Sequence, residues 1–340
     1  MANAIALFKK YIDLLDDVYK AASCSSVLDM DGSLVQAGAN ANEIIIPKIS
    51  MDGLADYSRN GGYVQGNVEI TNETVKFNYD RGRKFSVDAM DNEETAGLAF
   101  GKLASEFIRT KAVPEMDAVR FASYAAINGI GSKTETIGGA EAFMDSVREG
   151  VNVLDEAEVP ADGRYLFVTP TLYNAAQSLY SYVSKSVLEG FAGIIKVPQS
   201  RFWTAVSLLN GTSSGEEIGG FKRAEAVYEV TTSQPDDWST NYKDYYTVSD
   251  GVYSPVTGNS APSWTASKYY KQTSAGGAPI NFMIVHKPAV IQFGKHTVSK
   301  VISPDNNPDA DAYIFSYRAY GLTDAYENKA AGIYCSHAEV

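Results

Sequence analysis

Histidine and cysteine are the side chains most often used to bind metals and to attack substrates, and this chain spaces them too widely for either task. The histidines are His286, His296 and His337, and no two of them have the helical or finger spacing of a zinc site. Cys24 and Cys335 lie near opposite ends of the chain, without an activating base beside them in the sequence. We therefore expect no metal site and no cysteine nucleophile.

Acidic side chains offer a second kind of chemistry, since two carboxylates held close together can act as general acid and general base. Asp155, Glu156 and Glu158 form such a group. They precede Pro160 at the predicted end of a helix, where a solvated turn is the simpler interpretation. An enzyme built on these carboxylates is a distant alternative.

Phosphate-binding motifs are also missing, because the sequence contains no GxxxxGK loop and no GxGxxG between a strand and a helix. The sequence thus predicts no catalytic residue, no cofactor-binding residue and no metal ligand. We expect a protein that is not an enzyme and that uses no cofactor.

The charge of the chain argues against nucleic-acid binding. The net charge is −12, no run of five basic residues occurs, and the densest basic cluster is Arg81, Arg83 and Lys84. Phosphate backbones require clustered cations, so direct nucleic-acid binding is not expected. A local basic face made by the fold stays open as an alternative.

The 22 tyrosines point to contacts instead. Tyrosine has a broad apolar face and a polar tip, which suits half-buried surfaces and subunit interfaces. Packing in a β-rich fold would explain them equally well.

Two distant cysteines favour a reducing compartment over a disulfide framework. The N-terminus lacks a signal-peptide layout, and no run approaches 18 apolar residues. We expect the protein to be made and assembled in a cytoplasm, without a membrane.

The elements that would position any site begin with an amphipathic helix at 3–20, followed by a loose segment to 42 and a strand at 43–50. Pro47 marks that strand as an edge. Residues 61–90 predict a two-stranded ribbon with one apolar face, with a turn at 71–73 and a break at Gly82. An isolated ribbon is only marginally stable, so it should lie against a neighbour or form one edge of an internal sheet.

A long helix is predicted at 91–113, with Asp91 as N-cap and Pro114 ending it. The middle of the chain alternates further helices and strands. We expect helices at 115–126, 140–156 and 172–182, a loop at 128–139, and strands at 165–168 and 193–197.

Composition changes at 211–277, which is rich in Ser, Thr, Gly and aromatic residues. Pro235, Trp238 and Tyr245-Tyr246 are echoed by Pro262, Trp264 and Tyr269-Tyr270, which predicts paired aromatic strands in a small inserted module. We favour aromatic packing there over a carbohydrate site. Strands follow at 280–285, 289–293, 312–320 and 332–336, so the fold class is α+β.

Several phrases, in order over about 270 residues, resemble the major capsid proteins of tailed bacteriophages of the Hong Kong 97 type, whose fold encapsulins share. They are Ile44–Ile49 with Gly53–Tyr57; Asp80-Arg81; Phe85–Asp91 with Glu94; Val113–Asp117; Leu154–Glu156 with Val159-Pro160 and Gly163–Val168; Val197-Pro198 with Arg201-Phe202; and Tyr320–Leu322 with Asp324–Tyr326.

The resemblance implies a capsid architecture with seven parts. These are an N-terminal arm (1–42), a peripheral-domain entry strand (43–60), an extended β-hairpin loop (61–90), the long spine helix and peripheral domain (91–150), the axial domain (151–210), a β-rich insertion domain (211–277), and return strands of the axial and peripheral domains (278–340).

The resemblance also implies a structural function, which is the assembly of many copies into a shell. Pentamers and hexamers of this chain would close an icosahedral shell around double-stranded DNA in a virion, with scaffolding, portal and decoration proteins as further partners. Some relatives crosslink through Lys and Asn; we expect no crosslink here from Lys76 or Lys84 to Asn306 or Asn307. The alternatives are an encapsulin-like nanocompartment shell and a phage tail or decoration protein.

Overall fold

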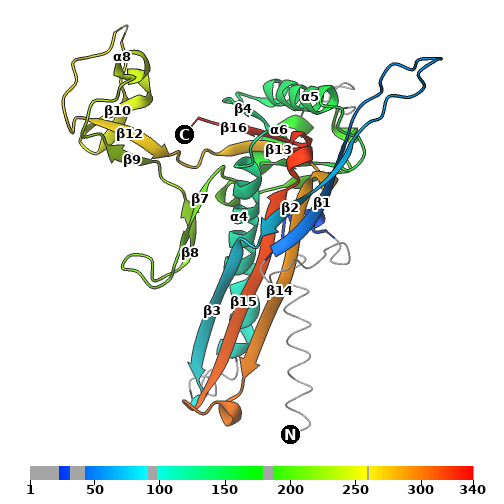
Figure 1. The fold of residues 1–340 in the computed structure, drawn as a ribbon. Helices are drawn as coiled ribbons and strands as arrows, with labels where there is room; N and C mark the ends of the chain where they lie inside the picture. Colours follow the sequence, from blue (N-terminus) through cyan, green and yellow to red (C-terminus); the bar gives the residue numbers. More distant parts are fainter. Residues whose placement is uncertain (1–22, 31–42, 91–97, 179–186, 259, 340) are drawn as a thin grey trace. The chain divides into compact units, whose positions relative to one another are not determined.

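The computed structural model describes residues 23–30, 43–90, 98–178, 187–258 and 260–339 (Figure 1). The chain divides into two compact units. The first comprises residues 1–110 and 287–329, and the second comprises residues 111–286 and 330–340. The predicted helix at 3–20, the Asp91 cap with Glu94, and part of the predicted helix at 172–182 fall outside the described residues.

The first unit is built on an antiparallel sheet of three strands in the order β14-β15-β3 (Figure 1). Its strands are β3 (Tyr79–Asp88), β14 (Val290–Ile302) and β15 (Ala312–Ala325). Helix α3 (Leu98–Phe107) packs on the sheet through Phe107, whose ring lies 4.9 Å from that of Phe85 and 6.1 Å from that of Phe315. Edge-on aromatic contacts of this kind add to the area that they bury.

The predicted break at Gly82 is wrong, because β3 runs through it without interruption. A Cβ atom at Gly82 would lie 2.9 Å from the carbonyl oxygen of Tyr317 on β15. This glycine therefore permits a close approach of two strands and does not end one.

The ribbon is formed by different strands from those expected. Strand β1 (Glu43–Met51) pairs antiparallel with β2 (Val68–Lys76) over nine residue pairs, while β3 pairs with β15. The pairing predicted within 61–90 is thus wrong, and β2 passes through Thr71, Asn72 and Glu73 without a turn. The continuous hydrogen-bonded pairing with β1 outweighs the turn propensity of these three residues. Pro47 stands opposite Asn72 in a two-stranded sheet, so the prediction of an edge strand is confirmed.

Pro114 does not end the helix, contrary to the prediction. A π-helical segment at Ile108–Ala112 follows α3, and α4 (Val113–Ala125) begins with Pro114 in its first turn. Proline has no N–H to donate and is tolerated in a first turn, and the wider π turn removes the clash that its ring would cause in a regular helix.

The second unit holds a mixed sheet of five strands in the order β4-β16-β13-β5-β6. Helices α5 (Ala140–Glu156) and α6 (Pro170–Gln177) pack on it, as predicted from the apolar stripe of 140–156. A Cβ at Gly150 of α5 would lie 2.8 Å from the ring of Tyr334, so glycine lets that ring reach the helix. The strands are β4 (Gly131–Thr134), β5 (Arg164–Val168), β6 (Gly193–Lys196), β13 (Ile280–His286) and β16 (Ile333–His337).

Strand β4 lies within 128–139, which was predicted to be a loop. Its four residues, Gly-Ser-Lys-Thr, carry no apolar alternation, and the strand forms by parallel pairing with β16. A pairing partner some 200 residues away leaves no local signal.

Residues 206–274 form two small sheets, the first of which begins before the predicted module at 211–277. Strands β7 (Val206–Leu209) and β8 (Gly220–Arg223) pair with each other, and a four-stranded sheet has the order β11-β10-β12-β9. Tyr246 on β10 stands opposite Tyr270 on β12, so the predicted pairing of the aromatic strands is confirmed. The remaining elements are β9 (Val227–Val230), α8 (Trp238–Asn241), β10 (Tyr245–Ser249), β11 (Val252–Pro255) and β12 (Tyr269–Ser274), with 3₁₀ turns at Ser26–Leu28, Gln199–Arg201, Tyr242–Asp244, Lys287–Ala289, Pro304–Asn306 and Glu327–Gly332.

Candidate assembly interface

The β1–β2 ribbon carries a clean division between an apolar and a polar face in its outer half. Paired residues of two antiparallel strands share a face, and successive pairs alternate between faces. The pairs Ile49–Ile70 and Met51–Val68 therefore share one face, while Ser50–Glu69 lies on the other. The outer ribbon is amphipathic.

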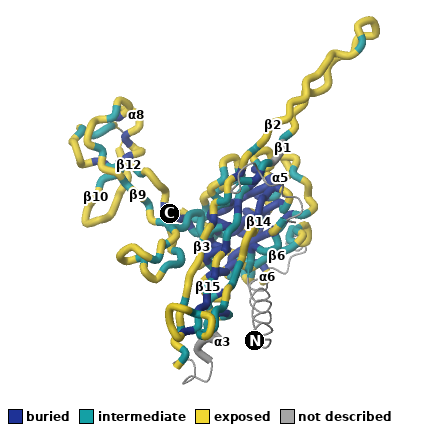
Figure 2. Tube along the Cα trace, turned by 60° about the horizontal axis from the view of Figure 1, so that its bottom comes forward, coloured by how far each residue is buried: buried dark blue, intermediate teal, exposed yellow. Residues whose placement is uncertain are grey.

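Its apolar face is open to solvent. Ile49, Met51, Val68 and Ile70 expose between 60% and 68% of their surface. Figure 2 shows the ribbon as an exposed extension beyond the buried residues of its unit. Contiguous exposed apolar residues on an ordered element mark a surface that binds another molecule.

The apolar surface continues into the connection between the two strands, residues 52–67. Leu54 is fully exposed, and Tyr63 exposes 90% of its surface. The ring of Tyr63 lies 4.9 Å from that of Tyr57, and the backbone groups of Ser58 and Gly62 exchange hydrogen bonds. The tip of the ribbon is thus shaped by its own contacts while its large side chains face outward.

The base of the ribbon, in contrast, is anchored in its own unit. Ile44 and Val75, a pair on the face opposite Ile49, are buried in a cluster with Ile291 of β14 and Leu322 of β15. The same ribbon therefore uses one face for its own core and presents the other, farther out, to solvent.

Charged groups reinforce this anchor. The Lys48 ammonium forms ion pairs with Glu327 and with Glu73, the latter at 3.0 Å between Nζ and Oε2. Its hydrogen bonds to Glu327 and then to Glu73 raise the pKa of Lys48, so the ammonium stays charged. Lys48 thus joins both strands of the ribbon to the end of the three-stranded sheet.

The residues considered for metal chemistry are not brought together. Within the described residues, no group of three or more His, Cys, Asp or Glu side chains is arranged to hold a metal ion. His286 is buried on β13, His296 is exposed on β14, and His337 ends β16 with its ring 3.5 Å from the Thr134 hydroxyl. No described helix is long and apolar enough to cross a membrane.

The thiol and carboxylate candidates have structural surroundings. Burial raises the pKa of Cys335 to about 12, which makes it a poor nucleophile, and Cys24 is half-buried. Asp155 pairs with Arg164 at 2.7 Å and not with a second carboxylate. Glu158 adopts a positive φ of 55°, typical of the turn expected there.

One sequence motif was overlooked. Residues 211–215 read G-x-S-x-G, the pattern of the nucleophile elbow of hydrolases. The motif lies in the connection from β7 to β8 and not between a strand and a helix. Asn210 accepts a hydrogen bond from the Ser213 amide at 2.8 Å and donates one to its hydroxyl at 2.6 Å, so Ser213 serves a turn.

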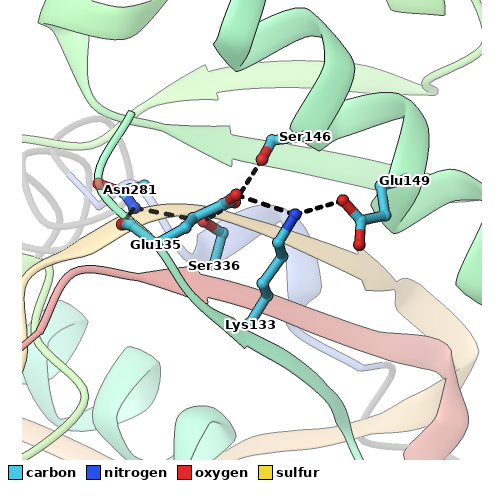
Figure 3. Close-up of polar contacts among 6 residues, drawn as sticks. All are labelled: Lys133, Glu135, Ser146, Glu149, Asn281 and Ser336. Atoms are coloured by element: carbon cyan, nitrogen blue, oxygen red, sulfur yellow. Dashed lines mark hydrogen bonds and ion pairs between the residues drawn. The ribbon is translucent and has the colours of Figure 1, made fainter. Parts of the chain in front are cut away.

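A network of polar side chains in the second unit was also missed, because its members come from separate elements (Figure 3). Glu135 accepts hydrogen bonds from Ser146 of α5 and, at 2.7 Å, from Ser336 of β16, and it pairs with Lys133 at 3.1 Å. Lys133 also pairs with Glu149 of α5. The network fastens β4 to its neighbours.

The Glu135 carboxylate is held ionised in this network. Burial by itself would raise the pKa of Glu135, but the hydrogen bonds from Ser146, Ser336 and Lys133 outweigh burial and lower it. One ammonium, Lys133, is shared by the two carboxylates Glu135 and Glu149, and the two serine hydroxyls satisfy the rest of Glu135, so the arrangement stabilises the fold.

Comparison with solved structures identifies the fold of this chain. No protein-family model matches the chain, and no curated protein matches it in sequence. Among solved structures, the capsid structure of the cyanophage P-SCSP1u is similar over 92% of this chain and 86% of that one, with a TM-score of 0.50 at 9% identity. The chain has the phage major capsid protein fold.

Two further solved structures are similar to this one. A chain in the structure of the head fiber and inner core protein gp22 of bacteriophage P68 matches with a TM-score of 0.50 at 10% identity, over 93% of this chain and 84% of that one. The virus-like particle from Pyrococcus furiosus has a TM-score of 0.48 at 12% identity, over 97% and 99%. Identities this low leave function to be argued from the residues themselves.

Proposed function

We propose that this chain is a major capsid protein, which assembles into an icosahedral shell around the double-stranded DNA of a tailed bacteriophage. The observation that carries the proposal is the exposed apolar face of the outer β1–β2 ribbon. The capsid fold supports it.

The ribbon acts as the extended loop of one subunit and lies on the next subunit. Its base is held in the core of its own unit, which fixes where the outer part of the ribbon lies. The four apolar side chains of the outer face provide the area that is buried against the next subunit. Burial between copies removes an apolar surface that water would otherwise cover, and repetition around a ring yields pentamers and hexamers.

In this function the arm (1–42), spine helix, axial domain and insertion (211–277) are parts of one shell subunit located in the virion. DNA is enclosed cargo, in keeping with the net charge of −12. Scaffolding, portal and decoration proteins are the expected further partners, assembly takes place in the host cytoplasm, and no covalent crosslink joins the subunits.

Electron microscopy of the purified chain tests the proposal. Closed shells, rings or capsomers are the expected result. A strictly monomeric chain at high concentration, with crowding agents present, would contradict it. Shells of uniform small size filled with a host enzyme, isolated from uninfected cells, would favour an encapsulin-like function instead.

A further inference from the structure

The four-stranded sheet β11-β10-β12-β9 has two aromatic faces, and only one of them forms a core. On the core face, Trp238, Tyr245 and Tyr269 are buried together, and Trp264 packs against them. The indole N–H of Trp238 donates to the carbonyl oxygen of Pro262 at 2.9 Å. The tryptophans of the repeated sequence pattern are therefore used in folding the module.

The opposite face displays tyrosines. Because neighbours along a strand alternate between faces, Tyr246 and Tyr270 point away from Tyr245 and Tyr269, and they stand opposite each other in the sheet. Tyr228 of β9 and Tyr253 of β11 belong to the two outer strands, yet their rings stack at 4.0 Å with an interplanar angle of 9°. We call Tyr228, Tyr246, Tyr253 and Tyr270 the tyrosine face.

These rings form one continuous aromatic surface. The Tyr228 ring also lies 4.8 Å from that of Tyr246, and the Tyr253 ring lies 5.2 Å from that of Tyr270. Tyr253 is exposed and the other three are half-buried, so part of each ring remains accessible to solvent. Its fixed geometry means that little conformational freedom is lost when a ligand binds.

The remaining side chains of this face identify the chemistry of its ligand. Val230 and Val248 are exposed on it, and Gln272 accepts a hydrogen bond from the Tyr246 hydroxyl at 3.2 Å. None of these residues is charged, in a chain whose net charge is −12. A neutral ligand with both apolar faces and hydroxyl groups fits this combination of rings, phenol groups and an amide.

The face is too small to form a stable protein–protein interface by itself. Four strands about 4.8 Å apart and five residues long at about 3.3 Å each cover roughly 300 Å². A stable protein–protein interface buries about 800 Å² on each side. A few sugar rings, in contrast, are covered by a surface of this size.

We propose that the tyrosine face binds a neutral polysaccharide chain, whose sugar rings stack on the tyrosine rings. The hydroxyl groups of the sugar exchange hydrogen bonds with the phenol groups and with the Gln272 amide. The tyrosine face and the ribbon belong to different units of the chain.

Isothermal titration calorimetry of the full chain with maltohexaose, cellohexaose and chitohexaose tests the proposal. Saturable binding of at least one of them is expected. Tyr253→Ala should weaken this binding at least tenfold, and Val248→Lys should weaken it too because it places a charge on the face without removing a ring. Glu229→Gln, which changes an exposed side chain on the other face of the same sheet, is the matched control and should leave binding unchanged.

Tryptophan fluorescence and near-ultraviolet circular dichroism establish that each variant keeps the core around Trp238 and Trp264. Three results overturn the proposal. The first is no binding of any neutral hexasaccharide by the folded chain, and the second is binding by Tyr253→Ala and Val248→Lys that is as tight as that of the unmodified chain. The third is preferential binding of a heparin hexasaccharide. Electron microscopy of the same samples reports on assembly separately, so failure of one proposal is distinguished from failure of the other.

Discussion

Replacement of two isoleucines on the apolar face of the ribbon should raise the protein concentration needed for shell assembly without unfolding the subunit. Ile49 and Ile70 stand opposite each other and expose 60% and 67% of their surface. Full burial of an isoleucine contributes about 1.5–3 kcal/mol, so burying the exposed two thirds of each contributes about 1–2 kcal/mol. The double variant Ile49→Ser/Ile70→Ser therefore loses about 2–4 kcal/mol per ribbon contact.

That loss is large for an assembly contact. Each 1.4 kcal/mol is a factor of ten in an equilibrium constant, so the contact weakens roughly 30-fold to 1,000-fold. Because every subunit of a ring contributes one ribbon, the threshold concentration for assembly should rise by a similar factor. The subunit itself should keep its stability, since exposed side chains change it by about 0.5 kcal/mol or less.

Light scattering as a function of protein concentration measures the threshold for assembly, and urea unfolding measures the free energy of unfolding of the subunit. Ser50→Ala/Thr71→Ser is the matched control, because both residues lie on the polar face of the same ribbon. The control should assemble as the unmodified chain does. An unchanged threshold for Ile49→Ser/Ile70→Ser would refute the argument that this face is buried between subunits.

Three further predictions concern stability. Val75→Ala removes a side chain that is 5% exposed at the base of the ribbon, and should lower the free energy of unfolding by about 1–2 kcal/mol in urea titrations. Gly150→Ala should destabilise by about 1–3 kcal/mol in the same assay, because its Cβ would meet the Tyr334 ring at 2.8 Å; an unchanged midpoint would show that the ring moves freely. The lowered pKa of Glu135 means that its stabilisation is present above the pKa of an unfolded glutamate, about 4.3, and is lost as the pH falls through the lower folded value. Thermal unfolding should therefore show a steeper loss of stability on acidification in the unmodified chain than in Glu135→Gln, and parallel curves would contradict this.

Local patterns in the sequence identified most elements but not their partners. The apolar stripe of 140–156 predicted α5 with its bounds, since a helix closes its hydrogen bonds within itself. Strand β2 was predicted as two strands, with Val68 and Ile70 in one, Val75 in the other and a turn at 71–73 between them. The structure shows one strand paired with β1, because the ladder that defines a strand is closed by residues far away in the chain. The short strand β4 had no signal of its own for the same reason.

The candidate interface, too, could be predicted from the sequence only in part. Alternation of apolar and polar residues predicted an amphipathic ribbon within 61–90, whereas the ribbon of the structure pairs β1 with β2. The order of short sequence segments along the chain predicted the capsid fold. The sequence could not distinguish Val75, which is buried at the base, from Ile70, which is exposed farther out. They lie on opposite faces of β2, and only the folded chain places β14 and β15 against the face of Val75.

The sequence by itself determined the fold class and the aromatic character of residues 211–277, because these follow from residue type and local spacing. Tertiary structure alone decided that β1 and not β3 completes the ribbon, that Ile44 and Val75 anchor it, and that the module hides its tryptophans while displaying its tyrosines. The physical reason is that burial and strand pairing are made by residues distant in sequence, and only the folded chain brings them together.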